Sequence, residues 1–200
     1  MTADLLSEEH RLLRDTVLAF ARAELGPIAD EIDQADAFPP DLFPKLGALG
    51  ILGVTVPREY GGAGADLLSG VLIIEQLARV SASVALSYGA HANLCTHNLF
   101  TNGSEQQRRA YLPGLCSGAL IGALAITEPD AGSDATGIRT TAVADGDDFV
   151  LNGTKMFITN GTIADVVVLY AKTAPDKGAH GITTFIVEKG FGGFRASRKL

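Results

Sequence analysis

The sequence predicts an α+β protein in which an all-α helical domain, residues 1–120, precedes an antiparallel β-sandwich or barrel domain, residues 121–200. Before residue 120, apolar residues recur at helical spacing behind Ser residues that can cap helices. After residue 120, short strand-like runs alternate with Gly-containing turns. Helices followed by strands, rather than alternating with them, are typical of the α+β class.

Each predicted helix of the first domain begins at a residue that suits a helix start. Ser7 precedes two Glu residues, which the helix dipole favours in a first turn. Gly26-Pro27 would kink or end this first helix. The run from Leu67 to Val80 is apolar on nearly every side, which predicts a buried helix. The predicted helices begin after Ser7, at Pro39-Pro40, at Leu67, after Ser81 or Ser83, and after Ser104.

The second domain is predicted to contain short strands separated by turns. Asp-Gly and Asn-Gly pairs punctuate this region and are strong turn signals. Because the strands are short and closely spaced, an antiparallel arrangement is expected. The predicted strands are Leu120–Ile126, Arg139–Ala144, Phe149–Leu151, Lys155–Thr159, Val166–Lys172 and Ile182–Glu188.

Two stretches of the second domain indicate a binding site. Leu124–Asp134 (LAITEPDAGSD) is an apolar strand that runs into a turn of Pro, Gly and Ser, which predicts a rigid ledge of N–H groups and small hydroxyls. Met156–Gly161 (MFITNG) places Phe157 and Thr159 two residues apart, on the same side of a strand. An aromatic face, a hydroxyl and backbone donors suit a flat, electron-accepting ring with a phosphate tail.

Composition argues against several function classes. The formal net charge of −7 argues against nucleic acid as a partner. No apolar run reaches the roughly 20 residues of a membrane helix, and the first residues resemble neither a signal nor a transit peptide. Cys95 and Cys116 form no CxxC pair, which favours a reducing, cytoplasmic setting.

Two further patterns were weighed as cofactor sites. His91 and Cys95 share a helix face, but His97 lies off it, so we interpret all three as packed polar residues and expect no metal. Gly62-Ala63-Gly64 is similar to the start of a dinucleotide-binding turn. However, the third glycine of that motif would fall at Leu67, so we interpret the segment as a connector between helices.

Glu128 and Asp134 are the acidic residues of the ledge. Either could be proposed as a catalytic acid. A carboxylate beside an electron-rich ring edge is better used to bind backbone N–H groups. We therefore interpret both as structural rather than catalytic.

Several motifs together resemble the acyl-CoA dehydrogenase family. They are LAITEPDAGSD, LNGTKMFITNG, VPREYGGAG and YLPGLCSG, while SYGAHANLC and GITTFIVEKG are similar to the isovaleryl-CoA branch. The resemblance covers essentially the whole chain. It implies a helical domain, a middle β domain and a C-terminal four-helix domain, of which this chain supplies the first two. The catalytic glutamate and much of the subunit interface are then expected in the third domain, outside this chain.

The resemblance implies FAD as the cofactor. Backbone groups of Ile126 and Thr127, with the Thr127 hydroxyl, would meet the pyrimidine end of the flavin, where charge gathers on reduction. The Thr159 hydroxyl would approach N5, and Phe157 would pack on the ring. Ser133 would lie near both the pyrophosphate and the acyl-CoA chain. The full set of implied cofactor residues is Leu124, Ile126, Thr127, Ser133, Phe157, Ile158 and Thr159.

The implied substrate is an acyl-CoA thioester, and four further residues would contact it. Leu86 and Ala90 lie four apart on the helix that would close the acyl end, which favours a short branched, isovaleryl-like chain. Ala179-His180 stand where a Ser-Arg pair is usual beside CoA, so the expected phosphate contact is weakened. A basic cluster, Arg195, Arg198 and Lys199, is interpreted as a solvated strand end, with a CoA phosphate contact as the alternative.

The implied reaction is α,β-dehydrogenation to the trans-2-enoyl-CoA, as in leucine or fatty acid catabolism. Electrons would pass to an electron-transferring flavoprotein, and the full-length protein would be a homotetramer. Two alternatives remain open. One is a flavin monooxygenase or nitroalkane oxidase of the same architecture, and the other is a non-catalytic binding or assembly module that lacks the third domain.

Overall fold

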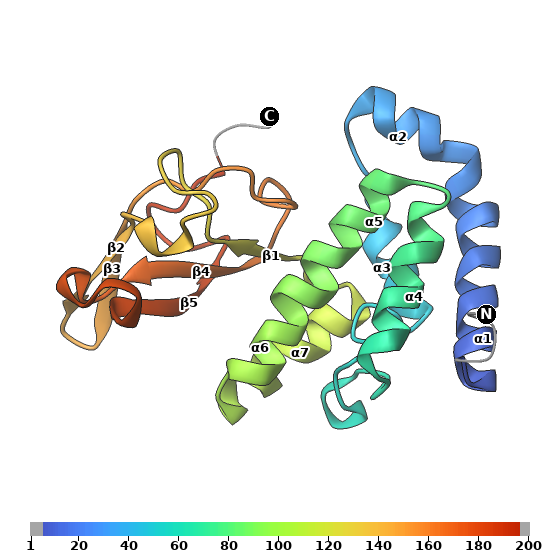
Figure 1. Cartoon of the computed structure of the whole chain (residues 1–200), viewed down its shortest axis with the longest axis horizontal. Helices are drawn as coiled ribbons and strands as arrows, with labels where there is room; N and C mark the ends of the chain where they lie inside the picture. The colour runs from blue at the N-terminus through green and yellow to red at the C-terminus, as the bar shows by residue number, and fades with distance from the viewer. Residues whose placement is uncertain (1–5, 197–200) are drawn as a thin grey trace. The chain divides into compact units, whose positions relative to one another are not determined.

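The structure, a computed structural model that describes residues 6–196, divides into two compact units at residues 120 and 121. The first unit is helical and the second is built on a sheet (Figure 1). The predicted α+β class, with helices first, is confirmed. No helix within residues 6–196 is both long enough and apolar enough to cross a bilayer.

The helical unit contains seven α-helices within the described residues. They are α1 (Glu8–Phe20), α2 (Ala29–Ala35), α3 (Leu42–Ala48), α4 (Leu67–Ala78), α5 (Ala82–Gly89), α6 (Asn98–Asn102) and α7 (Glu105–Ser117), with π-helical turns at Ala21–Leu25 and Ala90–His97 and 3₁₀ turns at Gly26–Ile28 and Arg58–Tyr60. Ser7 caps α1: its hydroxyl accepts the His10 N–H at 3.2 Å. Ser81 and Ser104 cap α5 and α7 in the same way, so the three predicted Ser-capped starts are confirmed. The helix predicted at Pro39-Pro40 begins at Leu42, and α2 was not predicted.

The core of this unit forms where α4 packs against α1 and α5, and α3 packs against α7 (Figure 1). Tyr88 of α5 is fully buried, and its hydroxyl donates to the Ile51 carbonyl at 3.0 Å. The prediction that Leu67–Val80 is buried on nearly every side is wrong, because Leu67 and Val71 of α4 are exposed in this structure. A helix that is apolar all round carries no pattern to show which face stays open.

In the sheet unit, residues 121–196 contain one five-stranded sheet. Its strands are β1 (Gly122–Ala125), β2 (Thr141–Asp145), β3 (Asp148–Asn152), β4 (Val166–Lys172) and β5 (Ile182–Glu188). They lie in the order β1-β4-β2-β3, and β5 pairs with β4. β2–β3 and β4–β5 are antiparallel, as predicted, but β1 runs parallel to β4. The sheet is therefore mixed, and the purely antiparallel prediction is wrong. Parallel partners are joined by long crossovers, which short turn signals do not reveal.

The predicted strand Lys155–Thr159 is not a strand. Phe157 has a φ of +56° and Asn160 a φ of +66°, both in the left-handed region, so the chain turns here instead of extending. Apolar and β-branched residues alone predicted a strand, and the backbone reversal overrides that preference. The other predicted strands are present, each with bounds shifted by no more than a few residues.

Candidate functional site

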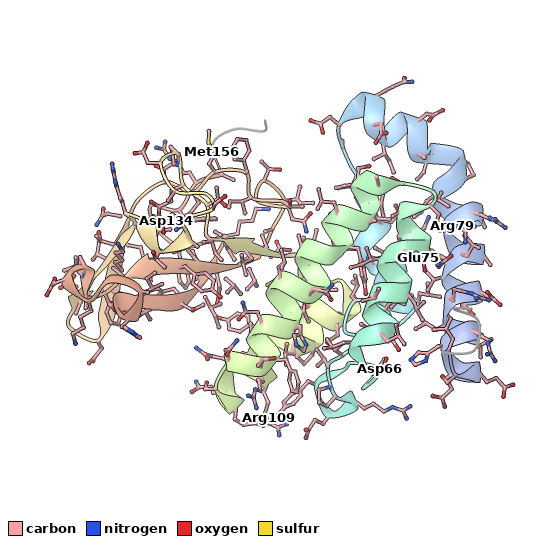
Figure 2. The ribbon with its side chains drawn as sticks, in the orientation of Figure 1. Asp66, Glu75, Arg79, Arg109, Asp134 and Met156 are labelled. Atoms are coloured by element: carbon pink, nitrogen blue, oxygen red, sulfur yellow. The ribbon has the colours of Figure 1, made fainter. Side chains whose placement is uncertain are left out.

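Two loops beside β1 are joined by hydrogen bonds between residues far apart in the sequence. The Met156 N–H donates to the Thr127 carbonyl at 2.8 Å, and the Asn160 side-chain amide donates to the Gly122 carbonyl at 3.2 Å. The segment that carries Met156, labelled in Figure 2, thus runs alongside β1 and its continuation in the opposite direction. The two stretches singled out by their sequence, 124–134 and 156–161, are brought together in this way.

Glu128 is buried, and its carboxylate accepts hydrogen bonds from two other segments. The donors are the Arg139 N–H at 2.6 Å, the N–H and hydroxyl of Thr140, and Lys155 Nζ at 2.8 Å. Burial by itself raises the pKa of this carboxyl, but hydrogen bonds from Lys155, Thr140 and the two N–H groups lower it to about 2. The interpretation that Glu128 binds backbone N–H groups is confirmed.

Lys155 is a site residue that sequence reasoning missed. Its Nζ donates to Glu128 Oε1 at 2.8 Å and to the Ile126 carbonyl at 2.9 Å. Burial lowers the pKa of this ammonium, and the contact with Glu128 opposes that effect. A signal for it was present in the sequence. Lys155 is the single charged residue of the segment 152–161, and a charge that becomes buried needs a partner of opposite sign.

Asp134 organises the turn that follows Ser133. Its Oδ1 accepts the Gly137 N–H at 3.2 Å and the Thr136 hydroxyl at 2.8 Å, which starts a 3₁₀ turn at Ala135–Gly137 (Figure 2). A Cβ at position 137 would meet Asp134 Oδ2 at 2.6 Å, so a larger residue there would displace the Asp134 carboxylate from this turn. Asp134 is thus tied to a backbone N–H, as interpreted from the sequence, and Ser133 stays exposed beside this fixed turn.

Phe157 presents an aromatic ring to solvent from a strained position. The residue is 72% exposed, and its φ of +56° is rare for a bulky side chain. The inference that strand spacing places Phe157 and Thr159 on one side is therefore wrong in its premise, because the segment is not a strand. Strain of this kind costs on the order of 1–3 kcal/mol and is concentrated at functional sites.

Three further residues of the two loops form a donor set that fits a flavin. Thr127 and Thr159 are half-buried hydroxyl residues, one on each loop, and the exposed Phe157 supplies an aromatic face. A flat heteroaromatic ring with hydrogen-bond acceptors matches this combination of groups. Five of the residues implied as cofactor contacts are half-buried: Leu124, Ile126, Thr127, Ile158 and Thr159.

Ala179 and His180 lie in the same unit, on a second loop. They belong to the 3₁₀ segment Pro175–Gly181, and both are exposed. This segment contacts the Ala135–Gly137 turn, so the structure places the Ser133 turn and the Ala179-His180 loop close together. Of the basic cluster, Arg195 is exposed. Arg198 and Lys199 fall outside the described residues.

Leu86 and Ala90 lie in the helical unit and differ in their surroundings. Leu86 of α5 is 66% exposed, whereas Ala90, the first residue of a π-helical turn, is buried. Residues four apart on a helix lie on neighbouring parts of one face, but within this unit only Leu86 of the two is exposed.

His91 is occupied by packing rather than by a ligand. It is fully buried, its Nε2–H donates to the Leu115 carbonyl at 3.0 Å, and its ring lies 5.1 Å from that of Phe43. Burial lowers the pKa of His91 to about 4. His97 Nδ1 hydrogen-bonds with the Thr55 hydroxyl at 2.8 Å. Within residues 6–196, no three His, Cys, Asp or Glu side chains are grouped as a metal site would require.

Comparison with known protein families matches both units. Residues 7–119 match the acyl-CoA dehydrogenase N-terminal domain, and residues 123–200 match the acyl-CoA dehydrogenase middle domain. The two matches follow one another along the chain and together cover nearly all of it.

Individual relatives agree with these matches. The chain is 50% identical over 199 residues to the mitochondrial isovaleryl-CoA dehydrogenase of Pongo abelii, covering 98% of this chain and 47% of that protein. The crystal structure of acyl-CoA dehydrogenase from Geobacillus kaustophilus is 40% identical with a TM-score of 0.93, covering 98% of this chain and 52% of that one. A Mycobacterium smegmatis glutaryl-CoA dehydrogenase in complex with FADH2 is 35% identical with a TM-score of 0.92, covering 98% and 49%. The chain thus spans about half the length of these relatives.

Proposed function

The chain belongs to the acyl-CoA dehydrogenase family, and we propose that the intact protein binds FAD and dehydrogenates an acyl-CoA thioester between its α and β carbons. The observation that carries this proposal is the pair of joined loops in the sheet unit. They present the exposed ring of Phe157 together with the hydroxyls of Thr127 and Thr159. A relative solved with FADH2 has the same architecture.

The residues of this chain would bind and tune the flavin. When bound, FAD supplies the acceptor for the β hydrogen, at its N5 atom. The N–H and hydroxyl of Thr127 would donate to the pyrimidine end of the ring, where fixed donors stabilise the negative charge that gathers on reduction. Phe157 would cover the ring and exclude water, and the Thr159 hydroxyl would lie toward N5. Leu124, Ile126, Ile158 and Ser133 complete the proposed contacts.

The base that removes the α proton is proposed to lie outside residues 1–200. The carboxylate of Glu128 is engaged by Arg139, Thr140 and Lys155. Asp134 is engaged by its own turn. A carboxylate already held by several donors at a pKa of about 2, as for Glu128, is a poor acceptor for a weakly acidic C–H proton.

For the substrate we propose a short branched acyl-CoA, with the trans-2-enoyl-CoA as product. The 50% identity to an isovaleryl-CoA dehydrogenase supports this choice. Leu86, backed by Ala90, would limit the acyl chain, and Ser133 with Ala179 and His180 would contact the CoA side. We also propose an electron-transferring flavoprotein as acceptor, a homotetrameric assembly and a cytoplasmic location.

Anaerobic titration of the intact, flavin-loaded protein with isovaleryl-CoA tests the proposal. We expect the visible flavin absorbance to bleach without oxygen, and an enoyl-CoA to form. A same-fold monooxygenase or nitroalkane oxidase would keep its oxidised spectrum with isovaleryl-CoA. An assembly module would purify without flavin and fail to take up added FAD, which would contradict the proposed function altogether.

A further inference from the structure

The Lys155–Glu128 ion pair is buried beneath the ledge. The two side chains are only 8% and 6% exposed. Burying two charges is unfavourable unless their remaining hydrogen bonds are satisfied. Here Glu128 has further donors in Arg139 and Thr140, and Lys155 has a second acceptor in the Ile126 carbonyl. A pair so completely satisfied holds its neighbours in a fixed geometry.

The contact to the Ile126 carbonyl determines where the next N–H points. The peptide bond between Ile126 and Thr127 is trans and planar, so its C=O and N–H point in opposite directions. Lys155 Nζ holds the carbonyl oxygen at 2.9 Å. The N–H of Thr127 must therefore point away from Lys155. This N–H is the donor that the proposed function assigns to the pyrimidine end of the flavin.

Glu128 connects this arrangement to the sheet. Its carboxylate is held by the N–H groups of Arg139 and Thr140, directly before β2. The Glu128 carboxylate binds Lys155 Nζ, and Lys155 Nζ also donates to the Ile126 carbonyl. The orientation of the Ile126–Thr127 peptide is thus fixed relative to the sheet rather than left to a flexible loop. Sites supported by rigid elements hold their geometry more tightly than sites on loops alone.

We propose that Lys155 and Glu128 form a positioning pair that aims the Thr127 N–H at the pyrimidine end of the flavin, an inference that rests on the proposed function. Neither side chain touches the cofactor in this proposal. In this proposal the pair acts through the direction of the Ile126–Thr127 peptide, whose carbonyl Lys155 holds.

Three variants of the intact protein test the pair: Lys155→Met, the double variant Lys155→Met/Glu128→Gln, and Thr140→Val. For each, FAD is titrated into the apoprotein, the midpoint potential of the bound flavin is measured, and urea unfolding of the apoprotein is followed. We expect Lys155→Met to weaken binding of oxidised FAD by about tenfold, the size of one lost hydrogen bond, and to weaken binding of the reduced, negatively charged flavin by about a further tenfold. A tenfold smaller preference for reduced over oxidised FAD lowers the potential by about 30 mV.

The double variant separates positioning from charge. It removes both charges, so a charge effect alone would return the potential to the wild-type value. Positioning predicts that the potential stays low, because a methionine side chain has no donor with which to hold the Ile126 carbonyl.

Thr140→Val is the milder variant, because it removes only one donor of Glu128. It is expected to shift FAD affinity and potential in the same direction as Lys155→Met but by a smaller amount, so the proposal can still be tested if Lys155→Met does not fold. Lys189→Met, which replaces an exposed lysine after β5, is the matched control and is expected to change neither quantity.

The experiment distinguishes failure of the positioning role from failure of the proposed function. Wild-type affinity and potential in folded Lys155→Met, or in Thr140→Val if the former does not fold, would overturn the positioning role while leaving the proposed function intact. A wild-type potential in the double variant would also overturn it. If the wild-type protein itself does not bind FAD, the proposed function fails first, and the pair is then structural only.

Discussion

The polar contacts that begin the helices differ from those that join the loops of the proposed site. Helices α1 and α7 begin at caps that connect residues three apart: the Ser7 hydroxyl accepts the His10 N–H, and the Ser104 hydroxyl accepts the Gln107 N–H. The loops of the proposed site are joined by contacts between residues far apart in the sequence, such as Lys155 with Ile126. A local contact stabilises the helix that contains it, whereas a distant contact joins two loops. The proposed site lies where the distant contacts gather.

The ion pairs of the two units differ in their exposure to water. Lys45 pairs with Glu24 across the helical unit, and each of these side chains is 45% exposed. Such pairs contribute little, because water already solvates both charges. Lys155 and Glu128 are shielded from water and depend on each other. The same residue types are therefore expected to respond very differently to substitution.

The largest expected effect is that of removing one member of the buried pair. Glu128→Ala should lower the free energy of unfolding by about 3–5 kcal/mol, because it leaves a buried ammonium without its partner. Glu128→Ala/Lys155→Met should recover part of that loss. Lys45→Met is the matched surface change and should leave the urea midpoint unaltered. Equal losses for the buried and the surface variant would remove the contrast between the units.

As pH falls, protonation should begin to weaken the helical unit at a higher pH than the sheet unit. The pKa of His91 falls from 6.5 to about 4 in the folded state, so the folded helical unit binds fewer protons than the unfolded chain as pH drops through that range. Between pH 6.5 and about 4, protonation of His91 in the unfolded chain should lower the free energy of unfolding of this unit by about 3 kcal/mol. The pKa of Glu128 falls from 4.5 to about 2, so the sheet unit should weaken only below about 4.5.

Urea unfolding at a series of pH values, followed by helical circular dichroism, measures the first range. His91→Phe, which would pack against Phe43, should flatten the dependence between pH 6.5 and about 4. A His91→Phe protein that keeps the wild-type pH dependence would show that another group is responsible.

Phe157 allows a test in which stability and binding move in opposite directions. Asn tolerates positive φ better than Phe, so Phe157→Asn should raise the free energy of unfolding of the apoprotein by about 1 kcal/mol through relief of strain. The same change should weaken FAD binding. Phe149→Asn in β3 is the control, since Phe149 has no positive φ and packs on Phe185 at 5.3 Å, and it should lower stability.

The smallest expected effect is the loss of a helix cap. Ser104→Ala should lower the free energy of unfolding by about 1 kcal/mol and leave the FAD affinity unchanged, because its hydroxyl serves only the start of α7. Ser104→Thr should retain most of the stability. A change in FAD affinity for Ser104→Ala would show that the caps and the loop contacts are not separable.

The same contrast explains what could be predicted from sequence. The caps at Ser7, Ser81 and Ser104 depend on residues three apart, so their patterns are visible in the chain itself. The parallel pairing of β1 with β4 depends on a crossover that no short motif records. The Ser-capped helix starts were therefore predicted closely, while for the sheet most strands and both hairpins were predicted but not the order of the strands.

The two stretches of the proposed site could be singled out from the sequence, but the contacts that join them could not. Thr127 and Phe157 could be proposed because they stand in local motifs. Lys155 was missed because its role depends on Ile126 and Glu128, nearly thirty residues away. The positive φ of Phe157 was missed for a related reason: surrounding hydrogen bonds hold a conformation that the residue itself disfavours.

Amide hydrogen exchange of the intact apoprotein with and without FAD measures the central claim, that the two joined loops hold the flavin. We predict slower exchange on FAD binding in residues 124–134 and 155–161, and unchanged exchange at the capped start of α1. Slower exchange elsewhere, with both loops unaffected, would contradict the assignment of this site.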